Sequence, residues 1–207
     1  MDGKSKVLYH IVCAAPPTQQ IESFITAAQH GGWDVCVIAT PNAMGFLDEV
    51  HIRNISGYPV RAEFKRFGEP DELPKADAVV TAPATFNTIN KLALGINDTL
   101  ALGQLTKALG LKIPLIMAPC ITHAYANHPQ FKKSLRILRR AGVEILYDPI
   151  NYHAPKIIPW ANILEALDRK YERGDKQKIS LLEEGYAEFK SMYQRIRTQL
   201  AASYAKR

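Results

Sequence analysis

The sequence lacks the features that mark disordered, fibrous and membrane-spanning proteins. Its 207 residues are 47% apolar and 22% charged, with 12 Gly and 13 Pro, which is an ordinary globular composition. No apolar run approaches the roughly 20 residues that a membrane helix requires. The run from Val7 to Ala15 is short and lacks the layout of a cleavable signal. We therefore expect a cytoplasmic protein with one main domain.

Cysteine is scarce, and the glycine fingerprint of dinucleotide sites is missing. Cys13, Cys36 and Cys120 are far apart and have no metal-ligand spacing, so we expect packing thiols in a reducing compartment and no metal site. No Gly-x-Gly-x-x-Gly motif occurs in the sequence. This argues against a nicotinamide dinucleotide site of the standard type.

The net charge is positive, +6 from 26 Lys and Arg against 20 Asp and Glu. This balance favours anionic ligands or partners without showing which. The basic residues are dispersed, and the densest group has helical spacing, which is typical of a solvated helix face. Nucleic acid is therefore not an expected partner. The group consists of Lys132, Lys133, Arg136, Arg139 and Arg140.

Short apolar runs alternate with helix-period segments, the pattern of a parallel sheet covered by helices on both faces. The expected fold class is α/β, a Rossmann-like three-layer α/β/α arrangement with about five to six parallel strands. The segment Phe46–Asp71 has no clean period and is expected to be irregular, apart from one short strand at Val60–Phe64. The main strands are expected at Val7–Cys13, Asp34–Ala39, Asp77–Thr81, Ile113–Ala118 and Val143–Tyr147.

Beyond Pro159 the pattern becomes helical. We therefore expect a domain over residues 1–159 and a C-terminal helical extension over residues 160–207. A capping box begins at Ser180, and an apolar stripe runs from Leu182 to Leu200. Such a stripe is typical of packing within the chain or between subunits.

Ligands of doubly wound sheets bind outside the carboxyl ends of the strands, so the loops at those ends are the candidate site. The first loop contains Pro16, Pro17 and Thr18, and the second contains Thr40, Pro41 and Asn42. Both loops could hold a phosphate, but each alone is a weak signal, because a Thr-Pro helix start is usually ordinary capping.

The third strand end is richer in polar groups than capping alone requires. It runs from Val79 through Thr81 to Pro83–Thr88, and places three hydroxyls and one amide at the mouth of the sheet. The following segment, Ile89–Leu100, completes a pattern that resembles a known family. That family is the homo-oligomeric flavin-containing cysteine decarboxylases, whose hallmark is Pro-Ala-Ser/Thr-x-Asn-Thr followed by a Lys/Ala-Gly-Ile-x-Asp-x-Leu helix.

The resemblance extends from about Lys6 to Pro159 and implies a flavin-binding Rossmann-like fold with FMN as cofactor, held between subunits of a homo-oligomer, a trimer or a dodecamer. It implies that the hallmark residues lie along the flavin and its phosphate, and that the two earlier loops and the loop after the fourth strand contribute. The implied cofactor residues are Pro16, Pro17, Thr18, Thr40, Asn42, Pro83, Thr85, Phe86, Asn87, Thr88 and Cys120.

Two catalytic markers of the family are changed in this sequence. Where the resemblance implies a catalytic His, fourteen positions before Pro83, this sequence has Glu69. Where it implies the Asn of Pro-x-Met-Asn-x-x-Met-Trp, this sequence has Thr122, and His123 follows directly. Glu69, Thr122 and His123 are therefore the candidate catalytic residues.

Three functions remain open at this point. The first is an FMN-dependent enzyme with altered redox or decarboxylase-type chemistry on a small acid or thiol. The second is a flavin-binding regulatory or assembly protein without turnover. The third is a nucleotide or phosphate binder on the same fold. The related flavin prenyltransferases are disfavoured, because the Gly-Ala-Ser loop and the Arg-Glu pair of that family are absent from this sequence.

Overall fold

The computed structural model describes residues 6–66, 68–69, 73–148 and 158–173, and a parallel sheet lies at its centre. Five strands follow the order β2-β1-β3-β4-β5, and every neighbouring pair is parallel. In this order the chain reverses its direction of winding between β1 and β3, the place where doubly wound sheets bind ligands. The strands are β1 Lys6–Val12, β2 Trp33–Ala39, β3 Ala78–Ala84, β4 Leu115–Pro119 and β5 Glu144–Ile145.

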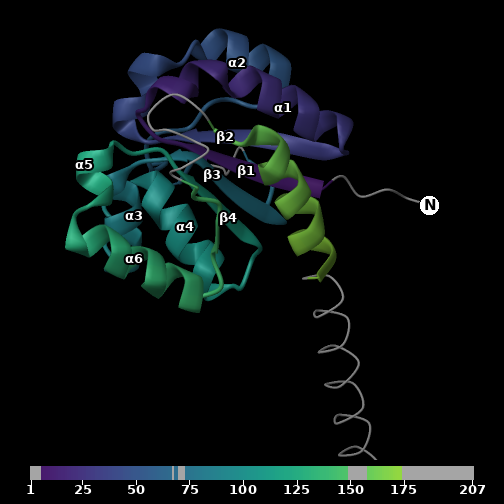
Figure 1. Ribbon diagram of the computed structural model, residues 1–207. Coiled ribbons are helices and arrows are strands. Elements are labelled where there is room, and N and C mark those ends of the chain that lie inside the picture. The colour runs from purple at the N-terminus through teal and green to yellow at the C-terminus, as the bar shows by residue number, and fades with distance from the viewer. Residues whose placement is uncertain (1–5, 67, 70–72, 149–157, 174–207) are drawn as a thin grey trace, which may run out of the picture. The chain divides into compact units, whose positions relative to one another are not determined.

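Helices cover both faces of the sheet, which confirms the expected three-layer α/β fold (Figure 1). Helices α1 and α2 lie on one face, and α3, α4 and α6 lie on the other. Two 3₁₀ helices, η1 and η2, follow β1 and β2, and a further helix spans residues 160–173. The bounds are η1 Pro16–Gln20, α1 Ile21–His30, η2 Pro41–Phe46, α2 Glu49–Ser56, α3 Phe86–Ala93, α4 Leu100–Gly110, α5 His123–Ala126 and α6 Pro129–Arg140.

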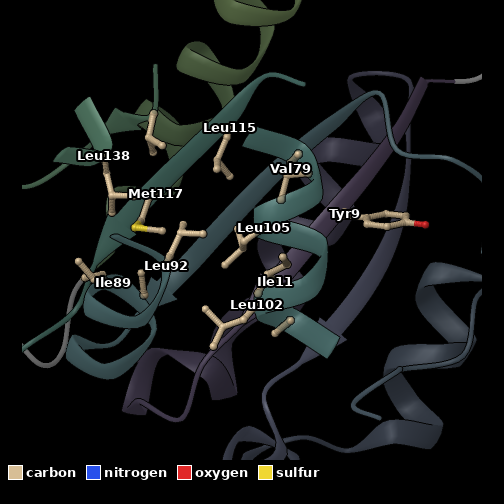
Figure 2. Close-up of a cluster of buried hydrophobic side chains, with 14 of the residues drawn as sticks. Tyr9, Ile11, Val79, Ile89, Leu92, Leu102, Leu105, Leu115, Met117 and Leu138 are labelled. Atoms are coloured by element: carbon tan, nitrogen blue, oxygen red, sulfur yellow. The ribbon is translucent and has the colours of Figure 1, made fainter. Parts of the chain in front are cut away.

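The core occupies both faces because alternate strand residues point to opposite sides. Tyr9 and Ile11 of β1 pack with Leu105 of α4 in the main hydrophobic cluster (Figure 2). His10, between them in sequence, contacts Phe24 of α1 on the opposite face, with ring centroids 4.6 Å apart. With both faces buried, the strands consist of nearly continuous apolar residues, which is why the sequence pattern located them.

The five main strands lie where they were expected, although β5 has two residues instead of five. The strand that extends furthest past its expected end is β3. This strand continues to Ala84, three residues beyond its expected end at Thr81. The additional residues form backbone hydrogen bonds, because the amide of Cys13 donates to the carbonyl of Pro83 and the amide of Cys120 donates to that of Ala84. The beginning of the hallmark therefore belongs to the sheet.

The expectation of irregular structure throughout Phe46–Asp71 is wrong, because α2 lies within it. The helix begins after Asp48, whose carboxylate accepts a hydrogen bond from the amide of His51, and it ends at Gly57 in the left-handed conformation, φ 78°. The apolar residues of α2 do not mark one buried face, because few of its residues are buried and the apolar Val50 is 71% exposed. The short strand expected at Val60–Phe64 is reduced to a single bridge from Arg61 to the edge of β2.

The C-terminal predictions are only partly within the described residues. The capping box at Ser180 and the stripe from Leu182 to Leu200 lie outside them, and the domain division at residue 159 stays a prediction. The indole Nε1 of Trp33 donates to the carboxylate of Asp168 at 3.3 Å. None of the helices in the described ranges is long and apolar enough to cross a membrane.

Candidate functional site

A cavity of about 650 Å³ opens at the carboxyl ends of the strands. The loops after β1, β2, β3 and β4 all contribute to its walls, as the winding of the sheet requires. Its volume lies within the usual range for a small-molecule site. The lining residues are Ala14, Ala15, Pro16, Thr40, Pro41, Asn42, Thr85, Phe86, Asn87, Thr88, Lys91, Thr99, Leu102, Cys120, Ile121, Thr122 and Tyr125.

Three threonines in this wall occupy the N-cap positions of η2, α3 and α5. N-cap threonines usually accept a hydrogen bond from the first turn of their own helix. The side chains of Thr40, Thr85 and Thr122 make no such bond. Thr99 does make it, accepting from the amide of Leu102 at 3.3 Å. Three threonine hydroxyls, one from each of three strand ends, therefore line the cavity without capping the helices that follow them.

The floor of the cavity is a small network of hydroxyl and thiol groups. Thr88 lies 3.3 Å from Thr85, measured between the two Oγ1 atoms, and accepts a hydrogen bond from the thiol of Cys13. Burial raises the pKa of the Cys13 thiol, and burial also raises the pKa of Cys120 to about 11. Both thiols are therefore protonated at neutral pH and act as packing groups, because the thiolate is the nucleophilic form.

One side of the cavity is aromatic. The rings of Phe86 and Tyr125 are stacked, with centroids 5.1 Å apart and planes 27° apart. His128 meets the edge of Phe86 at 5.5 Å, and its Nδ1 accepts a hydrogen bond from the amide of Gln130 at the start of α6. A flat aromatic ligand can stack on such a wall.

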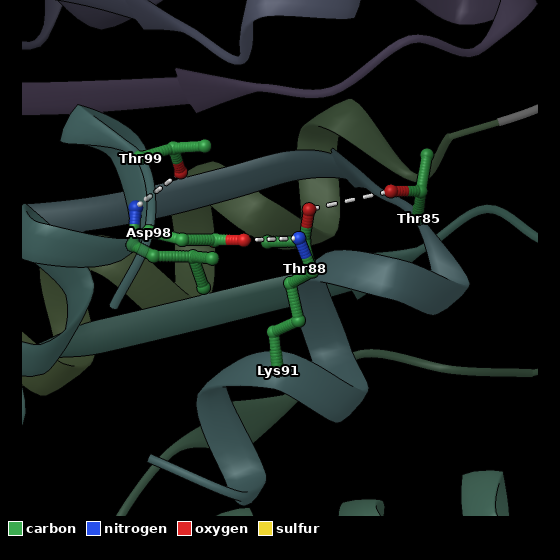
Figure 3. Close-up of polar contacts among 6 residues, drawn as sticks. Thr85, Thr88, Lys91, Asp98 and Thr99 are labelled. Carbon is green, nitrogen blue, oxygen red and sulfur yellow. Dashed lines mark hydrogen bonds and ion pairs between the residues drawn. The ribbon is translucent and has the colours of Figure 1, made fainter. Parts of the chain in front are cut away.

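Lys91, near the C-terminal end of α3, pairs with the carboxylate of Asp98, as Figure 3 shows. The Nζ of Lys91 lies 2.7 Å from the Oδ2 of Asp98, and both side chains are partly exposed. The hydrogen bond from Lys91 lowers the pKa of the Asp98 carboxyl. Lys91 lines the cavity, whereas Asp98 does not.

The sequence model of the flavoprotein family matches residues 4–172. The chain belongs to the flavoprotein family. This match confirms the resemblance that the hallmark residues and the loops indicated. It also supports a flavin as the cofactor of this flavoprotein. The cavity fits such a group, since among the described residues hydroxyls, amides and one ammonium line it together with an aromatic surface, and no carboxylate does.

Similar proteins include bifunctional proteins of coenzyme A biosynthesis. Coenzyme A biosynthesis bifunctional protein CoaBC of Thermococcus kodakarensis is 31% identical over 147 residues, which cover 69% of this chain and 36% of that protein. This flavoprotein thus spans about a third of that relative's length.

Solved structures share the fold, and two examples show the likeness. TvaF, an FMN-dependent cysteine decarboxylase from thioviridamide biosynthesis, has a TM-score of 0.67 at 21% identity, covering 82% of this chain and 99% of its own. The epidermin biosynthesis protein EpiD of Staphylococcus aureus has a TM-score of 0.58 at 25% identity, covering 68% of this chain and 82% of its own.

The structure brings most of the predicted site residues to the cavity, although their roles stay predictions. Those that line it are Pro16, Thr40, Asn42, Thr85, Phe86, Asn87, Thr88, Cys120 and Thr122.

Five predicted residues do not line the cavity. The hydroxyl of Thr18 is fully buried and donates to the carbonyl of Cys13 at 2.6 Å. Pro17 is buried in η1, and Pro83 is buried within β3. Glu69 is exposed, and its carboxylate accepts from the amide of Arg66. His123 is exposed, and its Nδ1 lies 3.1 Å from the amide nitrogen of Asn127.

Sequence reasoning did not assign Lys91, Thr99 and Leu102 to the site, yet all three line it. A signal for Lys91 was present, because it follows Thr88 by three positions and Asn87 by four. Residues at these spacings share one face of a helix. Thr99 and Leu102 had no comparable signal, since they arrive through the packing of α4 against α3.

Proposed function

We propose that this flavoprotein binds FMN noncovalently in the strand-end cavity and uses it in redox or decarboxylase-type chemistry on a small acid or thiol. The supporting observation is that three hydroxyls which do not cap their own helices line one cavity. They belong to Thr40, Thr85 and Thr122. Hydroxyl groups of this kind can donate to phosphate oxygens and to ring carbonyls. The similarity in fold to TvaF, an FMN-dependent cysteine decarboxylase, points the same way.

The residues of the chain have separate tasks in this proposal. Asn87 is exposed and lines the cavity, so its amide can both donate to and accept from the polar edge of the flavin. Phe86 and Tyr125 supply the apolar surface against which the ring system lies. A bound flavin accepts hydride equivalents from a substrate carbon.

The proton chemistry of the proposed reaction differs from that implied by the family. Glu69 and His123, which we predicted as catalytic, do not line the cavity, whereas Thr122 does. Among the described lining residues, the ionisable side chains are those of Lys91, Cys120 and Tyr125. No imidazole or carboxylate therefore stands ready as a general base in this part of the chain, and we propose that standard cysteine decarboxylation is slow or absent.

The same observation favours a second candidate, a flavin-binding regulatory or assembly protein without turnover. A flavin carrier needs the hydroxyls, the amide and the aromatic wall, but no base. An anaerobic titration with substrate separates the two candidates. The visible absorption of the bound flavin should be lost if the protein is an enzyme, and should stay if it only carries the flavin.

We also propose that the protein is a cytoplasmic homo-oligomer, a trimer or a dodecamer. Leu94 and Ile96 are 58% and 41% exposed, and they lie just after α3, the helix that lines the cavity, so two apolar side chains are available there for contact with another subunit. None of the three cysteines forms a disulfide and all three are buried, which suits a reducing compartment. Light scattering of the flavin-loaded protein should give at least three chains per particle, and a 23.1 kDa particle would contradict this assembly.

The decisive experiment for the cofactor is the absorption spectrum of the purified full chain. We expect visible flavin bands, and a released cofactor that co-migrates with FMN and not with FAD or riboflavin in chromatography. A colourless protein that also fails to quench FMN fluorescence up to high micromolar concentration would contradict the proposal.

A further inference from the structure

The cavity contains a single formal charge. Among the described residues that line it, Lys91 is the only one with a charged side chain. The others are apolar, hydroxyl, amide, thiol or phenol groups. Because a buried or half-buried anion needs a cation or several hydrogen-bond donors, this lysine is the charge that an anionic ligand would meet.

Lys91 is placed toward the ligand by the helix that carries the hallmark. Asn87, Thr88 and Lys91 occupy positions i, i+1 and i+4 of α3, and all three line the cavity. The ammonium therefore extends from the same helix face as the proposed flavin-binding groups. Its side chain is 35% exposed, so the charge is accessible.

The current partner of the ammonium comes from outside the cavity. Asp98 lies in the turn between α3 and α4, and its carboxylate is 2.7 Å from the Lys91 Nζ (Figure 3). The Asp98 side chain is 50% exposed. Ion pairs with this degree of exposure are weak, so water can solvate the carboxylate once another anion replaces it.

We propose that Lys91 is the anion-holding residue of the cavity, and that a phosphate or carboxylate of the ligand replaces Asp98 at its ammonium. This inference rests on the proposed flavin site. The anion has two sources, the phosphate of FMN and the carboxylate of a substrate. Both are oxygen anions that accept charge-assisted hydrogen bonds from an ammonium.

The first arm of the test measures the phosphate. Dissociation constants of FMN and of riboflavin, which lacks the phosphate, are measured by fluorescence quenching for the wild-type chain, Lys91→Gln and Asp98→Asn. If Lys91 holds the phosphate, Lys91→Gln weakens FMN about tenfold or more and leaves riboflavin unchanged. Asp98→Asn then tightens FMN by about two- to fivefold, because the competing carboxylate is gone.

The second arm measures the carboxylate. N-acetylcysteine and its uncharged amide are titrated into the FMN-loaded protein, and the change in the flavin spectrum reports binding. If Lys91 holds the carboxylate, the preference for the acid over the amide falls about tenfold or more in Lys91→Gln. The same preference rises in Asp98→Asn, while FMN affinity is equal in all three proteins.

The opposite signs of the two variants separate this role from a structural one. A bridge that only stabilises the turn after α3 is broken by Lys91→Gln and by Asp98→Asn alike, so both would change binding in the same direction. Lys107→Gln is the matched control. Lys107 is an exposed lysine near the end of α4 that does not line the cavity, and its loss changes the net charge equally.

The outcomes distinguish the two levels of the proposal. Wild-type protein that binds neither FMN nor riboflavin contradicts the proposed function, and the role of Lys91 with it. Wild-type protein that binds FMN, with FMN-to-riboflavin and acid-to-amide ratios unchanged in Lys91→Gln, contradicts the role of Lys91 alone. An equal change in Lys107→Gln contradicts it as well, because the effect would then come from net charge.

Discussion

The thiol of Cys13, just after β1, donates a hydrogen bond to the hydroxyl of Thr88 in α3, with Sγ and Oγ1 3.2 Å apart. The two residues are 75 positions apart in the chain, so this bond joins the first strand end to the helix of the hallmark. Both residues are buried at the base of the cavity. This contact therefore links α3, which lines the cavity, to the end of β1.

Replacing Thr88 by Val tests the contact directly. The substitution keeps the shape of the side chain and removes the hydroxyl that Cys13 and Thr85 contact. We expect the free energy of unfolding to fall by about 1 kcal/mol or more, and FMN affinity to fall with it. Urea unfolding followed by circular dichroism measures the first quantity, and fluorescence titration the second.

Thr81→Val is the matched control. Thr81 is fully buried in β3, and its hydroxyl has no hydrogen-bond partner among the described residues. Removing an unpaired buried hydroxyl relieves its desolvation cost, so this variant should be as stable as the wild type or more stable. Equal destabilisation by both substitutions would show that the Cys13 bond contributes nothing specific.

Asn87→Ala should weaken FMN binding more than any other truncation among the hallmark residues. The amide is exposed in the cavity, so its loss costs the free protein little and leaves the bound flavin with an unpaired polar group. We expect a loss of about 1–3 kcal/mol in binding, measured by titration. Asn54→Ala, at an exposed position of α2, is the control and should bind FMN normally. A normal affinity in Asn87→Ala would remove this residue from the site.

His10 should make the protein less stable in mild acid. It is fully buried, and desolvation lowers its pKa from 6.5 to about 4, against the hydrogen bond to the carbonyl of Ala82, which raises it. At a pH between these two values, His10 is protonated in the unfolded chain but not in the folded chain. The free energy of unfolding therefore falls as the pH drops from 6.5 toward 4. The loss is about 3 kcal/mol over that window.

Urea midpoints at a series of pH values measure this dependence. In His10→Gln most of the slope should vanish, since glutamine does not titrate and its amide can still donate to the carbonyl of Ala82. His51→Gln alters an exposed histidine that pairs with Glu22, and it should keep the slope of the wild type. An unchanged slope in His10→Gln would show that the buried ring is not the group responsible.

Standard cysteine decarboxylation should be slow, and Thr122→Asn should increase it. Loss of a general acid or base typically costs 10²–10⁴-fold, so we expect carbon dioxide release from a Cys-ended peptide or from phosphopantothenoylcysteine to be at trace level. Thr122 lines the cavity, whereas Glu69 does not, so the single change at Thr122 should have more effect than Glu69→His. Turnover near one per second by the unmodified chain would overturn this argument.

Much of the architecture could be predicted because it depends on local patterns. The strands are buried on both faces and therefore have apolar runs, and the hallmark at Pro83–Thr88 could be located by its residues alone. Helix α2 could not, because its caps at Asp48 and Gly57 carry the signal while Val50 points to solvent. Its extent depends on backbone capping more than on apolar periodicity.

The sequence by itself determined which residue types reach the strand ends, since parallel strands bring all their carboxyl ends to one edge. The tertiary structure alone decided which of their polar groups remain available to a ligand. Thr18 and Thr40 are similar in sequence, each in a proline-containing loop after a strand, yet Thr18 turns inward to the carbonyl of Cys13 and Thr40 lines the cavity. Most buried hydroxyls are hydrogen-bonded, and the packing of the loops determines which backbone groups lie within their reach.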